Sequence, residues 1–173
     1  MVTIAWGITG CGHFLEENLA LIRKLPRVDV FLSRAAVEVM KIYKFDPEQL
    51  HGPGVRLYRE GAYSAPVIGR FYNGYYKVLI IAPATSNSVA KFVAGISDTL
   101  VTNLFAHAGK CRVPIIVLPS DQEEEVTSPG PRGMVQLFPR PIDLENTARL
   151  KSFPGVIVVS GMEELEKCLD AYL

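Results

Sequence analysis

Short apolar runs alternate along the chain with longer segments whose apolar positions recur at helical spacing. Apolar, β-rich runs predict strands at 2–8, 28–32, 77–82, 113–118 and 156–159. Helical spacing predicts helices at 13–25, 34–43, 87–94, 96–108, 143–150 and 161–172. The less regular part, 44–76, adds a short strand at 55–58 and a short helix at 66–71. This alternation predicts an α/β fold, a three-layer, doubly wound (Rossmann-like or flavodoxin-like) parallel sheet.

A long connection, residues 119–141, separates the strand at 113–118 from the helix at 143–150. It is rich in proline and glycine, and an acidic run, 123–125, stands near its start. Its second half carries apolar side chains at Met134, Val135, Leu137 and Phe138. These side chains are too apolar for a tail in water, so we predict a functional flap within a single domain spanning 1–173.

The composition is that of a globular protein, with 49% hydrophobic and 21% charged residues. Lys and Arg number 18 and Asp and Glu number 18, so the net charge is zero. The basic residues are also scattered, which argues against nucleic acid or an anionic membrane as the main partner. No apolar run approaches the ~20 residues that span a bilayer.

Cysteine usage and the first residues predict a cytoplasmic protein. Cys11, Cys111 and Cys168 are odd in number and far apart, and no CxxC or Cys/His cluster suggests a metal site. The chain moves straight into a strand, without the basic region of a signal peptide.

Polar or glycine residues follow four of the predicted strands. They are the stretch from Gly7 to His13, Ser33, the stretch from Thr85 to Ser88, and Ser120-Asp121. Because the carboxyl ends of parallel strands share one edge of a doubly wound sheet, we expect these residues to form one site.

The stretch Thr85-Ser86-Asn87-Ser88 is the most informative of these, because it leads from a buried strand directly into a helix. Backbone N–H groups at a helix N-terminus attract anions, so this stretch suits a ligand with a phosphate or another electron-rich head. Ordinary capping explains the same residue types. The residues alone leave both interpretations open.

The glycine loop after the first strand matches neither GxGxxG nor a P-loop. Ser33 stands where an acidic residue would grip the ribose of NAD. Ser33 and the amides of the 10–13 loop could bind a phosphate monoester, and a tight turn with a helix cap explains the loop equally well. His13 either contacts such a phosphate or faces solvent.

Two motifs carry a family resemblance. Residues 81–91, Ile-Ala-Pro-Ala-Thr-Ser-Asn-Ser-Val-Ala-Lys, and residues 95–100, Gly-Ile-Ser-Asp-Thr-Leu, resemble the PASANT signature and the segment that follows it in a flavoprotein family. That family includes the phosphopantothenoylcysteine and lantibiotic-peptide cysteine decarboxylases. The residues 69–71 and 99–103 are most similar to its archaeal branch, archaeoflavoprotein and the acceptor-dependent dihydromethanopterin reductases.

The resemblance implies FMN, bound between subunits of a homotrimer. By position, Gly10, Cys11, Gly12 and Ser33 would hold the phosphate and ribityl chain. The resemblance also implies that Thr85, Ser86, Asn87 and Ser88 would contact the isoalloxazine and ribityl groups. Asp98 and Thr102 would line the pocket from the next helix, and Ser120 and Asp121 would approach the ring or the acceptor.

One departure from the family pattern affects the expected chemistry. The decarboxylases carry a catalytic His about eight residues before the strand that precedes PASANT, and Gly69 stands near that place here. We therefore expect an FMN-dependent oxidoreductase that takes electrons from a ferredoxin-like donor and passes them to an acceptor such as a pterin, with Asn87 and Asp121 as candidate catalytic residues. The alternatives are a flavin-dependent cysteine decarboxylase and a non-enzymatic module that binds a nucleotide or phosphate.

Overall fold

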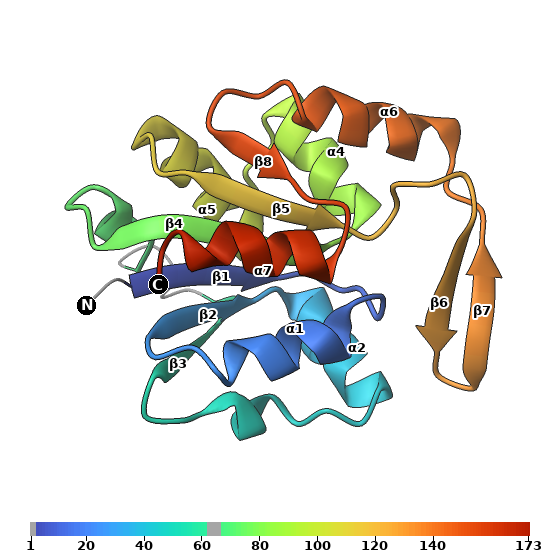
Figure 1. Cartoon of the computed structure of the whole chain (residues 1–173), viewed down its shortest axis with the longest axis horizontal. Coiled ribbons are helices and arrows are strands. Elements are labelled where there is room, and N and C mark those ends of the chain that lie inside the picture. The colour runs from blue at the N-terminus through green and yellow to red at the C-terminus, as the bar shows by residue number, and fades with distance from the viewer. Residues whose placement is uncertain (1–2, 62–66) are drawn as a thin grey trace.

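The computed structural model describes residues 3–61 and 67–173, and its centre is a six-stranded sheet. The strands run in the order β3-β2-β1-β4-β5-β8, and all neighbouring pairs are parallel (Figure 1). Their bounds are β1 Thr3–Ile8, β2 Val28–Leu32, β3 Val55–Arg59, β4 Tyr76–Ala84, β5 Ile115–Pro119 and β8 Val156–Val158. This confirms the doubly wound parallel sheet. The starts of the elements expected at 2–8 and 66–71 lie outside the described residues.

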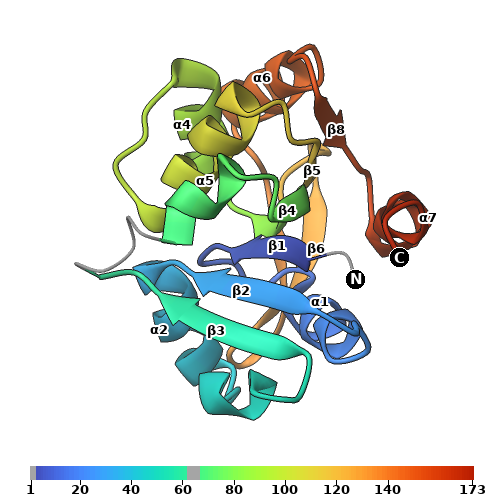
Figure 2. The same cartoon turned by 90° about the vertical axis from the view of Figure 1, so that its left-hand side faces the viewer.

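Helices cover both faces of the sheet. Their bounds are α1 Leu15–Ile22, α2 Arg34–Ile42, α4 Ser86–Ala94, α5 Leu100–Lys110, α6 Pro141–Leu150 and α7 Met162–Asp170. Short 3₁₀ helices lie at Pro47–Leu50 and Gly69–Phe71. Figure 2 shows α1 and α7 on one side of the sheet and α4 and α5 on the other.

Two hydrophobic clusters fill the two spaces between the sheet and the helices. Alternate residues of β1 point to opposite faces, so Ile4 and Trp6 join the cluster under α1, α2 and α7, while Ala5 joins the one under α4 and α5. The Trp6 indole is fully buried and donates its Nε1 hydrogen to the Ala82 carbonyl at 2.9 Å. The burial of β1 and β4 on both faces holds their carboxyl ends in fixed positions.

Two helices differ more than the others from the bounds that periodicity predicts. The first helix begins after Phe14, whose backbone is left-handed, and ends at Ile22 rather than 25. The helix expected at 96–108 spans Leu100–Lys110, because Thr99 and Thr102 form a capping box at its start. Residues 96–99 thus form a polar loop after α4, which ends at Gly95 in a left-handed conformation.

The connection 119–141 contains an antiparallel hairpin that the sequence analysis did not predict. Its strands are β6 Val126–Gly130 and β7 Gly133–Leu137. Figure 1 shows the hairpin beyond the carboxyl end of β5, apart from the central sheet. All residues of β7 are exposed, including Met134, Val135 and Leu137. Proline at 129 and glycines at 130 and 133 obscured the strand pattern.

A buried charge cluster lies at the opposite end of the strands. Asp29 on β2 is fully buried and accepts hydrogen bonds from Arg56 Nε at 2.8 Å, Arg70 Nη1 at 2.9 Å and Tyr76 Oη at 2.8 Å. The Tyr75 ring contacts both guanidinium groups. Within the described part of the chain, no helix is long and apolar enough to cross a membrane.

Candidate functional site

The strand order reverses between β1 and β4, which is where ligands bind in doubly wound sheets. Thr9, just after β1, ties the two strand ends together. Its Oγ1 donates to the Pro83 carbonyl at 2.9 Å and accepts from the Thr85 amide at 2.8 Å. The loops that follow β1 and β4 are therefore held side by side, as expected from the sequence.

A cavity of about 530 Å³ opens at this point, between the ends of α2, α4 and α5. Six of the expected residues line it: Gly10, Ser33, Thr85, Asn87, Ser88 and Asp98. The Ser33 hydroxyl accepts from the Ala36 amide at 3.0 Å and so caps α2. Thr85 likewise caps α4 by accepting from the Ser88 amide at 3.2 Å. Capping and cavity lining thus coexist in the same side chains.

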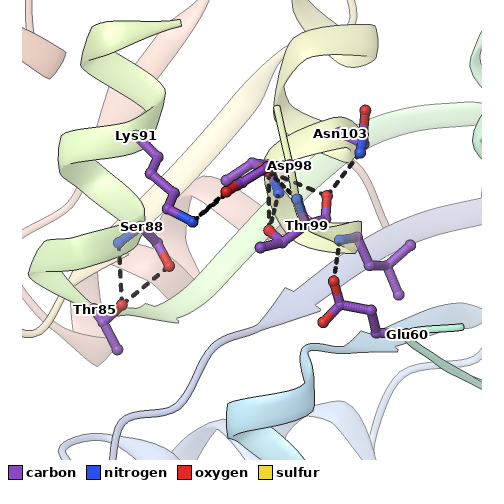
Figure 3. A network of polar contacts seen from close by, with 9 residues as sticks. Glu60, Thr85, Ser88, Lys91, Asp98, Thr99 and Asn103 are labelled. Carbon is purple, nitrogen blue, oxygen red and sulfur yellow. Dashed lines mark hydrogen bonds and ion pairs between the residues drawn. The ribbon is translucent and has the colours of Figure 1, made fainter. Parts of the chain in front are cut away.

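Glu60 joins two of the helix starts from across the cavity. Its carboxylate accepts from the backbone amides of Arg34 and Leu100, each at 3.0 Å. Figure 3 shows Glu60 and its bond to the amide at the start of α5. These are the first residues of α2 and α5, where a negative charge interacts favourably with the helix dipole. Glu60 therefore occupies two of the amides that a bound anion would otherwise use.

An ion pair forms another wall of this cavity. Lys91 on α4 reaches both carboxylate oxygens of Asp98 at 2.8 Å (Figure 3). The hydrogen bonds from Lys91 lower the pKa of Asp98. Lys91 lies one helical turn from Asn87 and Ser88, so it presents a cation on the same side of α4. The cavity thus contains a cation that an anionic ligand could engage.

A second cavity of about 430 Å³ meets the first at Gly10, Thr85 and Asn87. The expected residues Cys11, Gly12, Ser86, Ser120 and Asp121 line it, together with His13 and Tyr43. The hairpin forms its outer wall through residues that include Val126, Ser128, Pro129, Val135 and Leu137. The predicted flap segment therefore encloses part of the site.

The Asp121 carboxylate is held by two hydroxyls. Ser86 donates to it from the start of α4, and Ser120 donates to the same oxygen at 3.1 Å. Burial raises the pKa of the nearby Cys11 thiol to about 11, so this group is neutral at physiological pH. Burial also lowers the pKa of His13, although the charges of Glu17 and Asp121 oppose this shift.

Asn87 faces both cavities and is exposed. Among the described residues its side-chain amide has no hydrogen-bond partner. Its neighbours Thr85, Ser86 and Ser88 all bond within the protein. Asn87 is thus a polar group at the junction of the two cavities that is available to a ligand.

Thr102 differs from the other expected residues. It is 2% exposed and does not line either of these two cavities. Its hydroxyl is bonded to Thr99 in the capping box of α5, where it accepts from the Thr99 amide at 2.9 Å. Thr102 fixes the start of α5 and so supports the wall from behind.

Several lining residues were not expected from the sequence: Arg34, Glu60, Lys91 and Thr99 in the first cavity, and Tyr43 and the hairpin in the second. Lys91 could have been found, because the 3.6-residue period of α4 places it beside Asn87 and Ser88. Glu60 carried no such signal, because its role depends on two helix starts that are distant in sequence.

Comparison with known proteins gives a consistent result. The family model described as Flavoprotein matches residues 1–171. An uncharacterized protein of Methanocaldococcus jannaschii is 38% identical over 98% of this chain and 95% of its own length. A dihydromethanopterin reductase (acceptor) of Methanosarcina mazei is 39% identical over 74% of this chain. That match covers 59% of the reductase, so the chain matches little more than half of its length.

A solved structure is similar over nearly the whole chain. It is that of Burkholderia xenovorans DmrB in complex with FMN, described as a cubic protein cage for redox transfer. The identity is 42%, the TM-score is 0.88, and the match covers 98% of this chain and 94% of that one. The resemblance inferred from residues 81–91 and 95–100 is thereby confirmed at the level of the family.

Proposed function

The chain belongs to the Flavoprotein family, and on this premise we propose that it is an FMN-dependent oxidoreductase working at the junction of its two cavities. FMN is the ligand in the DmrB complex, and the reductase name of the Methanosarcina relative indicates redox chemistry. Bound FMN would supply the electron transfer, while the protein binds it, orients it and sets its potential.

The residues present fit this cofactor. The two cavities, of about 530 and 430 Å³, meet at Gly10, Thr85 and Asn87 and lie in the size range of cofactor sites. A Cβ on Gly10 would stand 2.6 Å from the Ala35 Cβ, so the loop after β1 lies against α2 as closely as only glycine allows. Such an approach brings backbone N–H groups close to a ligand.

We assign the phosphate and ribityl chain to Gly10, Cys11, Gly12 and Ser33, with Lys91 as the candidate counter-charge. Thr85, Ser86, Asn87 and Ser88 would contact the ribityl and isoalloxazine groups, and Ser120 and Asp121 would face the ring or the acceptor. The unpartnered amide of Asn87 carries this proposal, because a flavin ring offers both donors and acceptors to such a group. Asp98 contributes by holding Lys91 in place.

We propose a dihydropterin as the acceptor and a ferredoxin-like protein as the donor. The reductase relatives support the acceptor, since they are named for dihydromethanopterin. A cysteine decarboxylase is less well supported, because Gly69 stands near the place of the histidine that resemblance to those enzymes would require. A module that only binds nucleotides would hold the ligand without transferring electrons.

We propose a homotrimer or a multiple of trimers as the assembly. The exposed apolar side chains of Met134 and Phe138, 64% and 69% exposed, support burial of the hairpin region against further copies of the chain. The cage formed by DmrB supports the same assembly principle. The compartment expected from the free thiols of Cys11, Cys111 and Cys168 is the reducing cytoplasm.

The decisive experiment is the visible absorption spectrum of the purified protein, followed by anaerobic reduction with ferredoxin or dithionite and reoxidation by dihydromethanopterin. We expect a flavin spectrum that bleaches on reduction and recovers with the acceptor. Colourless protein that takes up no FMN on reconstitution would refute the proposal. Asn87→Ala should lower flavin retention or reactivity while the fold is kept, and Asn73→Ala, a change at an exposed position away from both cavities, should change neither.

A further inference from the structure

A third, smaller cavity lies against the second one. Its volume is about 250 Å³, and its lining includes Gln122, Glu123, Glu125, Thr127 and Ser160. Glu123 and Glu125 belong to the acidic run that the proposed function leaves without a role. Glu124, between them, does not line this cavity. We call this space the acidic side pocket.

His13 lies in the wall between the second cavity and the acidic side pocket. Of the residues that the structure describes, His13, Ser120 and Val126 alone line both of these spaces. The Nδ1 atom of His13 is shielded from solvent and has no hydrogen-bond partner among the described residues. The imidazole ring packs on Phe14 with a centroid separation of 3.9 Å, which fixes its position. The Nδ1 atom is therefore held in place but makes no hydrogen bond to the rest of the described fold.

Charged groups surround this ring from three elements. Glu17 approaches from α1 and Asp121 from the end of β5, and both favour the protonated imidazole. Glu123 and Glu125 face the side pocket from the connection that follows β5. Burial acts in the opposite direction and lowers the pKa of His13, which makes its protonated form a stronger acid.

We propose that His13 passes protons from the acidic side pocket into the second cavity and there protonates the nitrogen of a C=N bond in the acceptor. This inference rests on the proposed function and makes it more specific. The acceptor is a heterocycle reduced by a hydride and a proton, which together carry two electrons and two protons, rather than a one-electron partner protein.

The carbon of the C=N bond gains a hydride, which is one proton with two electrons, from reduced flavin, and the flavin is thereby oxidised. The C=N π bond breaks, and the nitrogen forms an N–H bond with the proton that His13 releases. Neutral His13 then recovers a proton from water through Glu123 and Glu125.

The functional test compares two acceptors on the FMN-loaded protein. His13→Gln should slow reoxidation of the reduced protein by 7,8-dihydromethanopterin by about 100-fold or more, the usual size of general-acid catalysis. Reoxidation by ferricyanide, which takes one electron and no proton, should keep its rate, and so should FMN retention. Equal slowing with both acceptors, or a wild-type rate with the pterin, would overturn the proposal.

The side pocket is tested with matched carboxyl variants. The double variant Glu123→Gln, Glu125→Gln should slow reduction of the pterin while leaving the ferricyanide rate unchanged. Glu124→Gln, which removes a neighbouring charge outside the pocket, should have no effect on either rate. The same slowing in Glu124→Gln would show that the overall negative charge of residues 123–125 affects the rate. It would overturn the assignment of a proton path through the acidic side pocket.

A titration without cofactor separates this inference from the proposed function. The pKa of His13 is followed by NMR in the protein free of FMN. Asp121→Asn should lower it further, because a negative charge that favours the imidazolium is lost, whereas Glu124→Gln should leave it unchanged. An unchanged pKa in Asp121→Asn overturns the inference even in a protein that is an active reductase. Protein that never binds FMN would instead refute the proposed function.

Discussion

The hydroxyl of Tyr43 donates a hydrogen bond of 2.6 Å to the backbone carbonyl of Pro129, and so ties the end of α2 to the hairpin. The same phenol lies over Gly12, where an added Cβ would come within 2.3 Å of its oxygen. Burial raises the pKa of Tyr43, so the hydroxyl keeps its proton at physiological pH. A side chain from a distant part of the sequence therefore helps to hold the hairpin wall of the second cavity.

Removal of this hydroxyl should loosen the hairpin. Tyr43→Phe deletes the exposed hydrogen bond to the Pro129 carbonyl, which water can then solvate, at a cost of about 0.5–1 kcal/mol. We expect faster amide hydrogen exchange in 126–137 and a small change in thermal stability. Tyr72→Phe is the matched control, because that hydroxyl bonds His107 away from the hairpin. Equal exchange in the hairpin of all three proteins would contradict the tether.

The positions of the strand-end residues could be predicted from the sequence because each signal is local. Ser33 and Thr85 each follow an apolar run and begin a helical pattern, and a parallel sheet places such points together. The two possibilities left open for Thr85 to Ser88, capping and ligand binding, both have a counterpart in the structure. Thr85 caps α4 and also lines both cavities.

The features that could not be predicted depend on contacts between distant segments. Glu60 contributes to the site only because α2 and α5 begin beside it and donate backbone amides to its carboxylate. The hairpin was hidden because Pro129 and Gly130 interrupt the alternation that normally marks a strand. The role of Thr102 as a pocket residue stays a prediction that rests on resemblance, since its hydroxyl is bonded within the capping box.

A methyl group at Gly10 should disturb the loop after β1. Gly10→Ala places a Cβ 2.6 Å from the Ala35 Cβ and 3.1 Å from the Ala35 carbonyl carbon, so the loop or α2 must shift. We expect a loss of about 1–3 kcal/mol in the free energy of unfolding and weaker FMN retention, measured by denaturant titration and by the flavin spectrum.

Gly109→Ala is the control for this substitution. A Cβ there meets no atom within 4 Å, and the position lies inside α5. Because alanine favours a helix over glycine by about 0.5–1 kcal/mol, this variant should be as stable as the parent or more stable. Equal stability of the two variants would show that the loop can yield to the methyl group.

Neutralising Asp29 should destabilise the fold without touching the site. Asp29→Asn leaves Arg56 and Arg70 facing a neutral amide in a fully buried position. Breaking such a pair costs about 3 kcal/mol, toward the lower end of the usual range because both guanidinium groups are partly exposed. Glu163→Gln, in an exposed pair with Lys167, should cost far less. Similar melting temperatures for the two variants would contradict a structural role for the cluster.

Folding stability should rise with pH between about 5.5 and 7.5, because two histidines titrate in that window. Burial lowers the pKa of His13 and of His107, and Lys110 adds to the shift at His107. The unfolded chain then binds more protons than the folded one near the ordinary pKa of 6.5. The stability that these two histidines contribute is therefore present above that pH and is lost as the pH falls. Melting temperatures measured at pH 5.5, 6.5 and 7.5 should therefore increase.

The rise of melting temperature with pH should flatten in the double variant His13→Gln, His107→Gln. It should persist in His51→Gln, whose ring pairs with Glu48 at the surface. A slope that survives in the double variant would mean that other groups cause it.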